Sequence, residues 1–262
     1  MSVYHDYEPA QFRAHDKTDL LAGPFDRQNK SLSGLLSKRP ARWKRLIDIA
    51  GSLAGLICLL PLLLIIGAYI KAVSPGPVLF RQVRVGRGGK SFECIKFRTM
   101  KPDADVSRHK TYLTDLINGG GQTPDGQQKM TKLHDDPQII PFGNVLREMG
   151  LDELPQLLNV LRGEMSLVGP RPPIAYEVEQ YKLWYKDRFD VAPGLTGLWQ
   201  ISGKNRLTFN EMIRLDIQYA RNVSFWLDMK ILICTPHAVY TQVKDHILRK
   251  RSAQKTSSMH TA

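Results

Sequence analysis

The longest apolar run in the chain covers residues 46–70, LIDIAGSLAGLICLLPLLLIIGAYI, and Asp48 is its single charged residue. As a straight helix this run would be roughly 37 Å long, which exceeds the hydrocarbon thickness of a bilayer, about 30 Å. Asp48 follows Arg45 by three residues, so the two side chains can pair at the membrane interface. The run begins too late and is too long for a secretory signal peptide. We therefore predict a membrane element over residues 38–73.

Pro61 lies in the middle of this run and predicts a break, because proline removes a helix hydrogen bond and clashes with the preceding turn. Basic residues flank both ends of the run, and the positive-inside rule places both flanks in the cytoplasm. We therefore favour a re-entrant helix-break-helix hairpin that enters one leaflet and returns. A proline-kinked spanning helix is the main alternative, and a buried core helix is the third interpretation.

After the membrane element, the pattern predicts a small cytosolic α/β domain over residues 74–243, so that the whole chain is of the α+β class. VLFRQVRVG and KSFECIKFRTM alternate apolar and polar residues around a GRGG turn, which predicts a short β-hairpin. MSLVGPRPP is expected to be extended, and PGLTGLWQISGKN to form a strand and turns. Helices, among them amphipathic helices at the membrane interface, are expected at residues 143–148, 152–161, 176–189, 207–222 and 225–244.

Three segments are too polar or irregular for a packed element. Residues 1–37 are expected to be a disordered polar tail. Residues 102–135 are rich in Asp, Gly and Gln and predict a loop around one short helix. Residues 244–262 are expected to be a basic disordered tail.

The composition adds a strong positive charge, since 37 Lys and Arg against 25 Asp and Glu give a net +12. Two basic blocks, at residues 38–45 and 71–101, account for the whole excess and bracket the membrane element. A charge of this sign indicates a polyanionic partner: nucleic acid, an anionic membrane surface or a phosphorylated substrate. The position of the charge makes nucleic acid the weakest of the three. The three cysteines match no disulfide scaffold or zinc motif and indicate a reducing compartment.

The candidate chemistry starts with Asp152 and Glu153 at the beginning of a predicted helix, with Arg147 just before them. One or two carboxylates together with substrate phosphates are the usual protein ligands of Mg²⁺. A carboxylate can also act as a nucleophile and form an acyl phosphate, and an arginine fork can clamp a phosphate. The structural alternative is that Asp152 is an N-cap and that the pair does no more than cap and solvate the helix.

Further cations lie in three other segments. The prolines of GPRPP hold Arg171 in place, Lys96 and Arg98 lie on the basic second strand, and Lys204 and Arg206 follow Trp199. Each could bind a phosphate or a nucleotide. Each also has a structural interpretation: a rigid linker, a solvated strand edge and a surface turn.

Taken together, these segments resemble the bacterial sugar transferase family of monotopic phosphoglycosyl transferases. The resemblance runs from about residue 44 to residue 244. It includes KRLID before the apolar run, Pro61 within it, and then SPGPVLFRQVRVG, FECIKFRTM, LDELPQLLNVLRGEMSLVGPRPP and PGLTGLWQISGKN. The LTGLWQISG form is most similar to the exopolysaccharide-initiating type.

The resemblance implies transfer of a hexose-1-phosphate from a UDP-sugar to undecaprenyl phosphate, as the first step of exopolysaccharide or other surface glycan synthesis. Asp152 would attack the β-phosphate, form a phosphosugar-aspartate and release UMP. Glu153 would complete the catalytic pair and, with Asp152, bind Mg²⁺. Residues that would bind substrate phosphate are Arg147, Lys96, Arg98, Arg171 and Arg206.

The same resemblance implies membrane lipids as a further partner, no nucleic acid, and the bacterial inner (cytoplasmic) membrane with the catalytic domain on its cytoplasmic face. The hairpin broken at Pro61 would bring the lipid acceptor to the site. Galactose or glucose is the favoured sugar, with an N-acetylated sugar as the alternative, and a homo-oligomer is left open. The competing hypothesis is a non-catalytic, membrane-anchored module that binds anionic lipid or nucleic acid.

Overall fold

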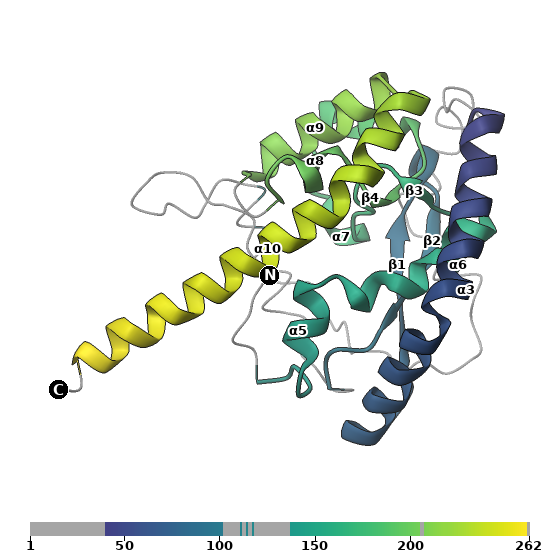
Figure 1. Ribbon diagram of the computed structural model, residues 1–262. Helices are drawn as coiled ribbons and strands as arrows, with labels where there is room; N and C mark the ends of the chain where they lie inside the picture. The colour runs from purple at the N-terminus through teal and green to yellow at the C-terminus, as the bar shows by residue number, and fades with distance from the viewer. Residues whose placement is uncertain are drawn as a thin grey trace, which may run out of the picture.

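The computed structural model describes residues 40–101, 111, 114, 117, 137–204 and 207–260. The expected tail at residues 1–37 and nearly all of the expected loop at 102–135 lie outside these ranges. Figure 1 shows helix α3 along one side of the domain beside strands β1 and β2, and the last helix projecting from the other side. The elements are α3 (Arg42–Val73), β1 (Leu79–Val85), η1 (Arg87–Gly89), β2 (Ser91–Phe97), α5 (Gly143–Glu148), η2 (Leu151–Gln156), α6 (Leu157–Arg162), β3 (Ser166–Val168), α7 (Ala175–Val178), η3 (Leu183–Asp190), β4 (Gly194–Thr196), α8 (Leu198–Ile201), α9 (Phe209–Arg221) and α10 (Phe225–His260).

The apolar run forms one continuous helix, α3, which includes Pro61. The predicted helix break at Pro61 is therefore wrong, because α3 continues on both sides of the proline. A proline removes one hydrogen bond of the ladder, and the long apolar flanks keep the remaining bonds, so that a helix can bend without ending. Figure 1 shows such a bend, with the two halves of α3 running in different directions. Among the described residues, α3 is the one helix long and apolar enough to cross a membrane.

The first turn of α3 is fixed to the domain by the buried side chain of Lys44. Its Nζ lies 2.6 Å from Oδ2 of Asp228 on α10, and the two side chains are only 6% and 3% exposed. The same ammonium group donates hydrogen bonds to the Tyr219 hydroxyl and the Val168 carbonyl, both at 3.0 Å. One charge thus joins α3 to β3, α9 and α10.

Asp48 and Arg45 add to this attachment, but not by pairing with each other as expected. Oδ1 of Asp48 accepts hydrogen bonds from Ser166 Oγ at 2.9 Å and from the Leu167 amide at 2.8 Å. The Arg45 guanidinium donates to two carbonyl groups in the last turn of α6, at 2.6 and 2.5 Å. A cation at the C-terminal end of a helix satisfies the carbonyls that lack a partner within the helix.

The second half of α3 packs against the domain through apolar contacts. Ile66 and Ile70 are buried in a cluster with Phe97 of β2, Ile140 and Leu146 of α5. The opposite face of the helix carries large apolar side chains that are each more than half exposed: Leu46, Leu53, Ile57, Leu60, Leu64 and Ile65. The helix is therefore attached to one domain near both of its ends and presents a continuous apolar face outwards.

The predicted β-hairpin is confirmed. Strands β1 and β2 pair antiparallel, with Leu79 opposite Phe97 and Val85 opposite Ser91. Gly88 adopts a positive φ of 64° in the connecting turn, a conformation in which glycine avoids the strain of a Cβ. Phe92 and Cys94 of β2 are buried together with Val160 and Met165, so the hairpin packs directly on α6.

The predicted helices are confirmed in part. The structure contains α5, the helix that ends at Gly163, α9 and α10. The single helix expected at 176–189 is wrong, because the chain forms the short α7 and the separate 3₁₀ helix η3. The rings of Tyr181 and Tyr185 both pack on Phe209 of α9, and such tertiary contacts override local helix propensity. Residues 193–205 contain β4, as expected, followed by the short helix α8.

The C-terminal segment also differs from its prediction. Residues 244–260, expected to be disordered, continue α10 as far as His260. No Gly or Pro follows Pro236 before residue 260, and Lys, Arg, Gln and Ala favour the helix. Figure 1 shows this part of α10 extending well beyond the domain.

Strands β3 and β4 pair in parallel, with Ser166 opposite Gly194, and glycines bring their main chains into unusually close contact. A Cβ at Gly194 would overlap the main-chain nitrogen of Gly169, and a Cβ at Gly169 would overlap the Ala192 carbonyl oxygen. Main-chain atoms cannot move aside as the end of a side chain can. The sequence GPRPP begins at this contact, so the contact positions the segment that contains Arg171.

We expect Gly194→Ala to destabilise the domain by about 1–3 kcal/mol or more, because the added methyl group overpacks a main-chain contact. Thermal unfolding of the purified protein in detergent measures the change. Gly67→Ala is the matched control, since its Cβ would meet only Val78 Cγ1, at an ordinary 3.5 Å. Equal unfolding temperatures for the two variants would show that the β3–β4 contact does not need glycine.

Candidate functional site

Asp152 and Glu153 lie in the first turn of η2, which leads directly into α6. The residue before η2 is Gly150, with a positive φ of 70°, so Asp152 is not the N-cap that the structural interpretation expected. Asp152 is only 8% exposed. The site thus begins with a largely desolvated carboxylate next to a partly exposed one, on a short helix packed against β2.

Glu153 is the point at which cations from other segments meet. Lys96 Nζ on β2 lies 3.4 Å from Glu153 Oε1. The negative charge of Glu153 also favours the charged forms of Arg84 and Arg171. The structure therefore brings one predicted phosphate-binding residue, Lys96, into contact with the predicted catalytic pair, and a second, Arg171, lies within electrostatic range of Glu153.

Arg84 is a member of this group that the sequence did not reveal. It is buried on β1, donates from Nε and Nη2 to Gln82 Oε1, and donates from Nη1 to the Pro172 carbonyl at 2.9 Å. Burial lowers the pKa of Arg84, and the nearby Arg171 lowers it further. Strand alternation places Arg81 and Arg84 on opposite faces of the hairpin, but nothing in the sequence shows which face is covered.

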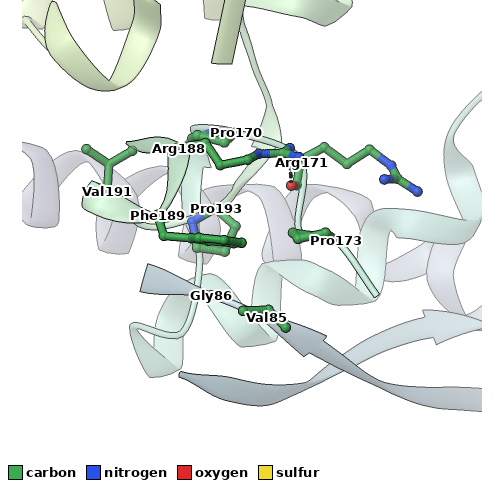
Figure 2. Close-up of a pocket in the computed structure, with 9 residues that line it drawn as sticks. All are labelled: Val85, Gly86, Pro170, Arg171, Pro173, Arg188, Phe189, Val191 and Pro193. Carbon is green, nitrogen blue, oxygen red and sulfur yellow. Dashed lines mark hydrogen bonds between the residues drawn. The ribbon is translucent and has the colours of Figure 1, made fainter. Parts of the chain in front are cut away.

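Arg171 is paired with a fully buried carboxylate. Its Nη1 donates to both carboxylate oxygens of Glu177, at 3.2 and 3.0 Å. Burial alone would lower the pKa of Arg171, but Glu177 outweighs this and raises it above its usual value. Figure 2 shows Arg171 among the residues that line a small pocket, with its side chain extending away from the other labelled residues.

The remaining predicted cations have different surroundings. Arg98 donates to the carbonyls of Ser74 and Pro75, at 2.9 and 2.5 Å, and so holds the turn after α3. These contacts give no support to its predicted role in binding phosphate. Arg147 lies in the last turn of α5, which packs against η2. Arg206 lies outside the described residues.

One contact within the segment that was predicted to bind a nucleotide is formed. The Lys204 ammonium group lies 5.9 Å from the centroid of the Trp199 ring, within the range of a cation–π contact. Trp199 itself is buried. The aromatic residue and one of the two cations that the sequence grouped are therefore in contact.

The described residues contain no cluster of three or more His, Cys, Asp or Glu side chains that could hold a metal ion. Asp152 and Glu153 offer two hard oxygen donors side by side. That donor set fits Mg²⁺, which typically takes one or two carboxylates and completes its shell with water and substrate phosphates.

Comparison with known proteins identifies relatives of this chain. A sequence model of the family described as bacterial sugar transferase matches residues 39–242. The galactosyl transferase CpsE of Streptococcus agalactiae is 42% identical over 194 residues, which are 73% of this chain and 41% of that protein. The exopolysaccharide production protein ExoY of Sinorhizobium fredii is 38% identical over 196 residues, 75% of this chain and 84% of ExoY.

A third relative is the undecaprenyl-phosphate galactose phosphotransferase of Salmonella typhimurium, 39% identical over 205 residues. The matched region covers 78% of this chain and 42% of that protein. The chain therefore spans about two fifths of two of these relatives and most of the third. The region matched by the family includes α3, the Asp152–Glu153 pair and Arg171.

We expect Arg98→Met to lower the free energy of unfolding by about 1–3 kcal/mol, because two carbonyl groups, of which that of Ser74 is buried, lose their charged donor. Differential scanning fluorimetry in detergent measures the shift. Arg81→Met is the control, because Arg81 forms only an exposed 3.4 Å pair with Glu93, which contributes about 0–1 kcal/mol. A variant at position 98 as stable as this control would mean that Arg98 does not hold the turn.

Proposed function

We propose that this chain, which belongs to the bacterial sugar transferase family, transfers a hexose-1-phosphate from a UDP-sugar to undecaprenyl phosphate. The observation that carries the proposal is the largely buried Asp152 beside Glu153, with the Lys96 ammonium group 3.4 Å from the Glu153 carboxylate. Relatives named for exopolysaccharide production and for undecaprenyl-phosphate galactose transfer support it. The step would begin exopolysaccharide or other surface glycan synthesis, and galactose is the first sugar to test.

In the first half of the proposed reaction, an oxygen of the Asp152 carboxylate attacks the β-phosphorus of the UDP-sugar. A phosphorus–oxygen bond forms to Asp152, and the bond from the β-phosphorus to the bridging oxygen breaks. The bridging oxygen keeps the electron pair and leaves as part of UMP. The sugar phosphate is then held covalently on Asp152.

In the second half, a phosphate oxygen of undecaprenyl phosphate attacks the same phosphorus. The bond to Asp152 breaks, its carboxylate is restored, and the product is the lipid diphosphate sugar. The transfer thus consists of two successive displacements at the same phosphorus, and one site serves both substrates in turn.

The cations have the task of balancing negative charge in both halves. UDP-sugar and undecaprenyl phosphate are both polyanions. Lys96, which pairs with Glu153, and Arg171, which is within electrostatic range of Glu153, are the cations that would hold their phosphates. Arg147 on the neighbouring α5 is a further candidate. When bound, Mg²⁺ would be held by Asp152 and Glu153 and would neutralise charge on the diphosphate.

The attachment of α3 supports a re-entrant arrangement in the membrane. A helix that crossed the bilayer would place its ends on opposite sides of a hydrocarbon layer about 30 Å thick. Lys44 near the start of α3 binds Asp228, while Ile70 near its end packs with Phe97. Both partners belong to one domain, so we place both ends of α3 on one side and its exposed apolar face in a single leaflet.

The same arrangement explains how two unlike substrates reach one site. Undecaprenyl phosphate stays in the lipid, whereas a UDP-sugar is dissolved in the cytosol. We therefore place the protein at the bacterial inner (cytoplasmic) membrane, with the domain on the cytoplasmic face. β2 contacts the second half of α3 through Phe97 and the catalytic pair through Lys96, so adjacent residues link the anchor and the chemistry.

We expect Asp152→Asn to reduce UMP release by at least about 10³-fold, because an amide oxygen cannot replace the carboxylate as nucleophile. The assay uses the purified full chain, UDP-galactose and undecaprenyl phosphate in detergent with Mg²⁺, with UDP-glucose and UDP-N-acetyl sugars in parallel. Wild-type protein incubated with labelled UDP-sugar alone should retain label on the peptide that contains residue 152.

The control for this experiment is Asp187→Asn, which changes a carboxylate that pairs with Arg221 on the surface and should leave the rate unchanged. Wild-type turnover in Asp152→Asn would contradict the covalent mechanism. If no UDP-sugar supports UMP release by the wild type, the non-catalytic membrane-anchored module becomes the better account.

We expect cysteines introduced at Arg42 and Lys101 to react with a membrane-impermeant maleimide from the same side of the membrane. The background carries Ser at the three native cysteines. Both positions are exposed, and they lie before and after the apolar part of α3. Labelling from opposite sides would contradict the re-entrant arrangement and support a spanning helix.

A further inference from the structure

We propose that a set of four residues, the buried Glu177, Arg188 and Asp216 and the partly buried Tyr181, positions Arg171 for the transfer reaction. We call these four residues the Arg171 cradle. The inference rests on the proposed function, since it gives a task to residues that do not reach the catalytic pair themselves. They act through Arg171 and are positioning residues.

The cradle holds Arg171 at two separate points. The guanidinium donates to both oxygens of Glu177. The Arg171 carbonyl accepts a 2.7 Å hydrogen bond from Nη2 of Arg188. Side chain and main chain are therefore both fixed, and Pro170 and Pro172 restrict the backbone on either side.

Within the cradle, the residues bind one another in a closed chain. Nη1 of Arg188 donates to the Tyr181 hydroxyl at 2.7 Å, and that hydroxyl donates to Glu177 Oε1 at 2.7 Å. Arg188 also forms an ion pair with Asp216 on α9. The chain returns to Arg171 through Glu177, so a displacement of any one member disturbs its neighbours.

Burial of these charges is difficult to explain by stability alone. Glu177, Arg188 and Asp216 are each at most 1% exposed. Taking charged pairs out of water is costly, and apolar residues of similar volume often give an equally or more stable protein. Burial alone would raise the pKa of Glu177, but Arg171 and Arg188 outweigh it and the pKa lies below its usual value. The carboxylate is thus kept charged to hold an arginine.

The direction in which the Arg171 side chain extends supports a role in binding substrate at the proposed catalytic site. In Figure 2 the Arg188 guanidinium lies against the Arg171 main chain, and the Arg171 side chain extends away from it. Arg171 also lies within electrostatic range of Glu153, whose negative charge favours the charged guanidinium. Its side chain keeps 21% exposure while that of Glu177 has none. A fixed and partly open guanidinium is suited to a diphosphate, because its donors are aligned before the substrate arrives.

The test measures UMP release by the full chain at varied UDP-sugar concentration, for the wild type, Glu177→Gln, Arg171→Met and the double variant. We expect Glu177→Gln to lower kcat/KM for UDP-sugar by about 10-fold or more, the size of effect of a lost charged hydrogen bond. Because Glu177 acts through Arg171, the double variant should be no slower than Arg171→Met. Multiplied losses in the double variant would overturn the proposal, since they would mean that Glu177 acts independently of Arg171.

Two further variants keep the test decisive if Glu177→Gln does not fold. Tyr181→Phe removes one hydroxyl and no charge, and it should lower kcat/KM in the same direction by about 3-fold. Asp187→Asn, next to the cradle residue Arg188 on η3, is the control and should match the wild type. Wild-type kcat/KM in Tyr181→Phe would overturn the cradle but leave the proposed function intact. Absence of UMP release from the wild type would overturn the proposed function itself.

Discussion

The ammonium group of Lys44 is buried against Asp228, Tyr219 and the Val168 carbonyl, and this one contact determines where α3 lies. Removal of either charged partner would leave the other buried and unpaired, at a cost of about 3–5 kcal/mol. The position of α3 in turn determines how the domain meets the lipid. The far end of α3 packs on Phe97 of β2. Lys96, the neighbouring residue on that strand, pairs with Glu153.

The same contacts change the interpretation of the +12 charge. The sequence suggested that the basic residues around the apolar run face lipid phosphates and substrates. Lys44 and Arg45 instead bind groups inside the protein, and Arg98 holds the turn after the helix. Part of the excess therefore connects the anchor to the domain. Under the proposed function, the cations that would meet the substrates are those near Glu153, one of which, Arg84, belongs to the second basic block but could not be singled out beforehand.

The sequence was informative wherever a local pattern determines the outcome. The hairpin followed from alternation and a glycine turn, and the end of α6 followed from Gly163, whose φ is 82°. The Asp152–Glu153 pair and Lys96 were identified by resemblance, and the structure brings them together. Tertiary contacts determine the features that the sequence did not predict. Residues 176–189 do not form one helix because their aromatic side chains pack on Phe209. The partners of Arg171 could not be predicted, because Glu177, Arg188 and Asp216 share no sequence pattern.

Lys44 and Asp228 are separated by 184 positions along the chain. At about 5–20 residues per second, a ribosome needs roughly 10–40 s to extend the chain from one to the other. During that interval α3 is complete, its apolar face is ready for lipid, and the aspartate that will hold it has not been made. Attachment to the membrane and closure of the domain are thus separate events in time.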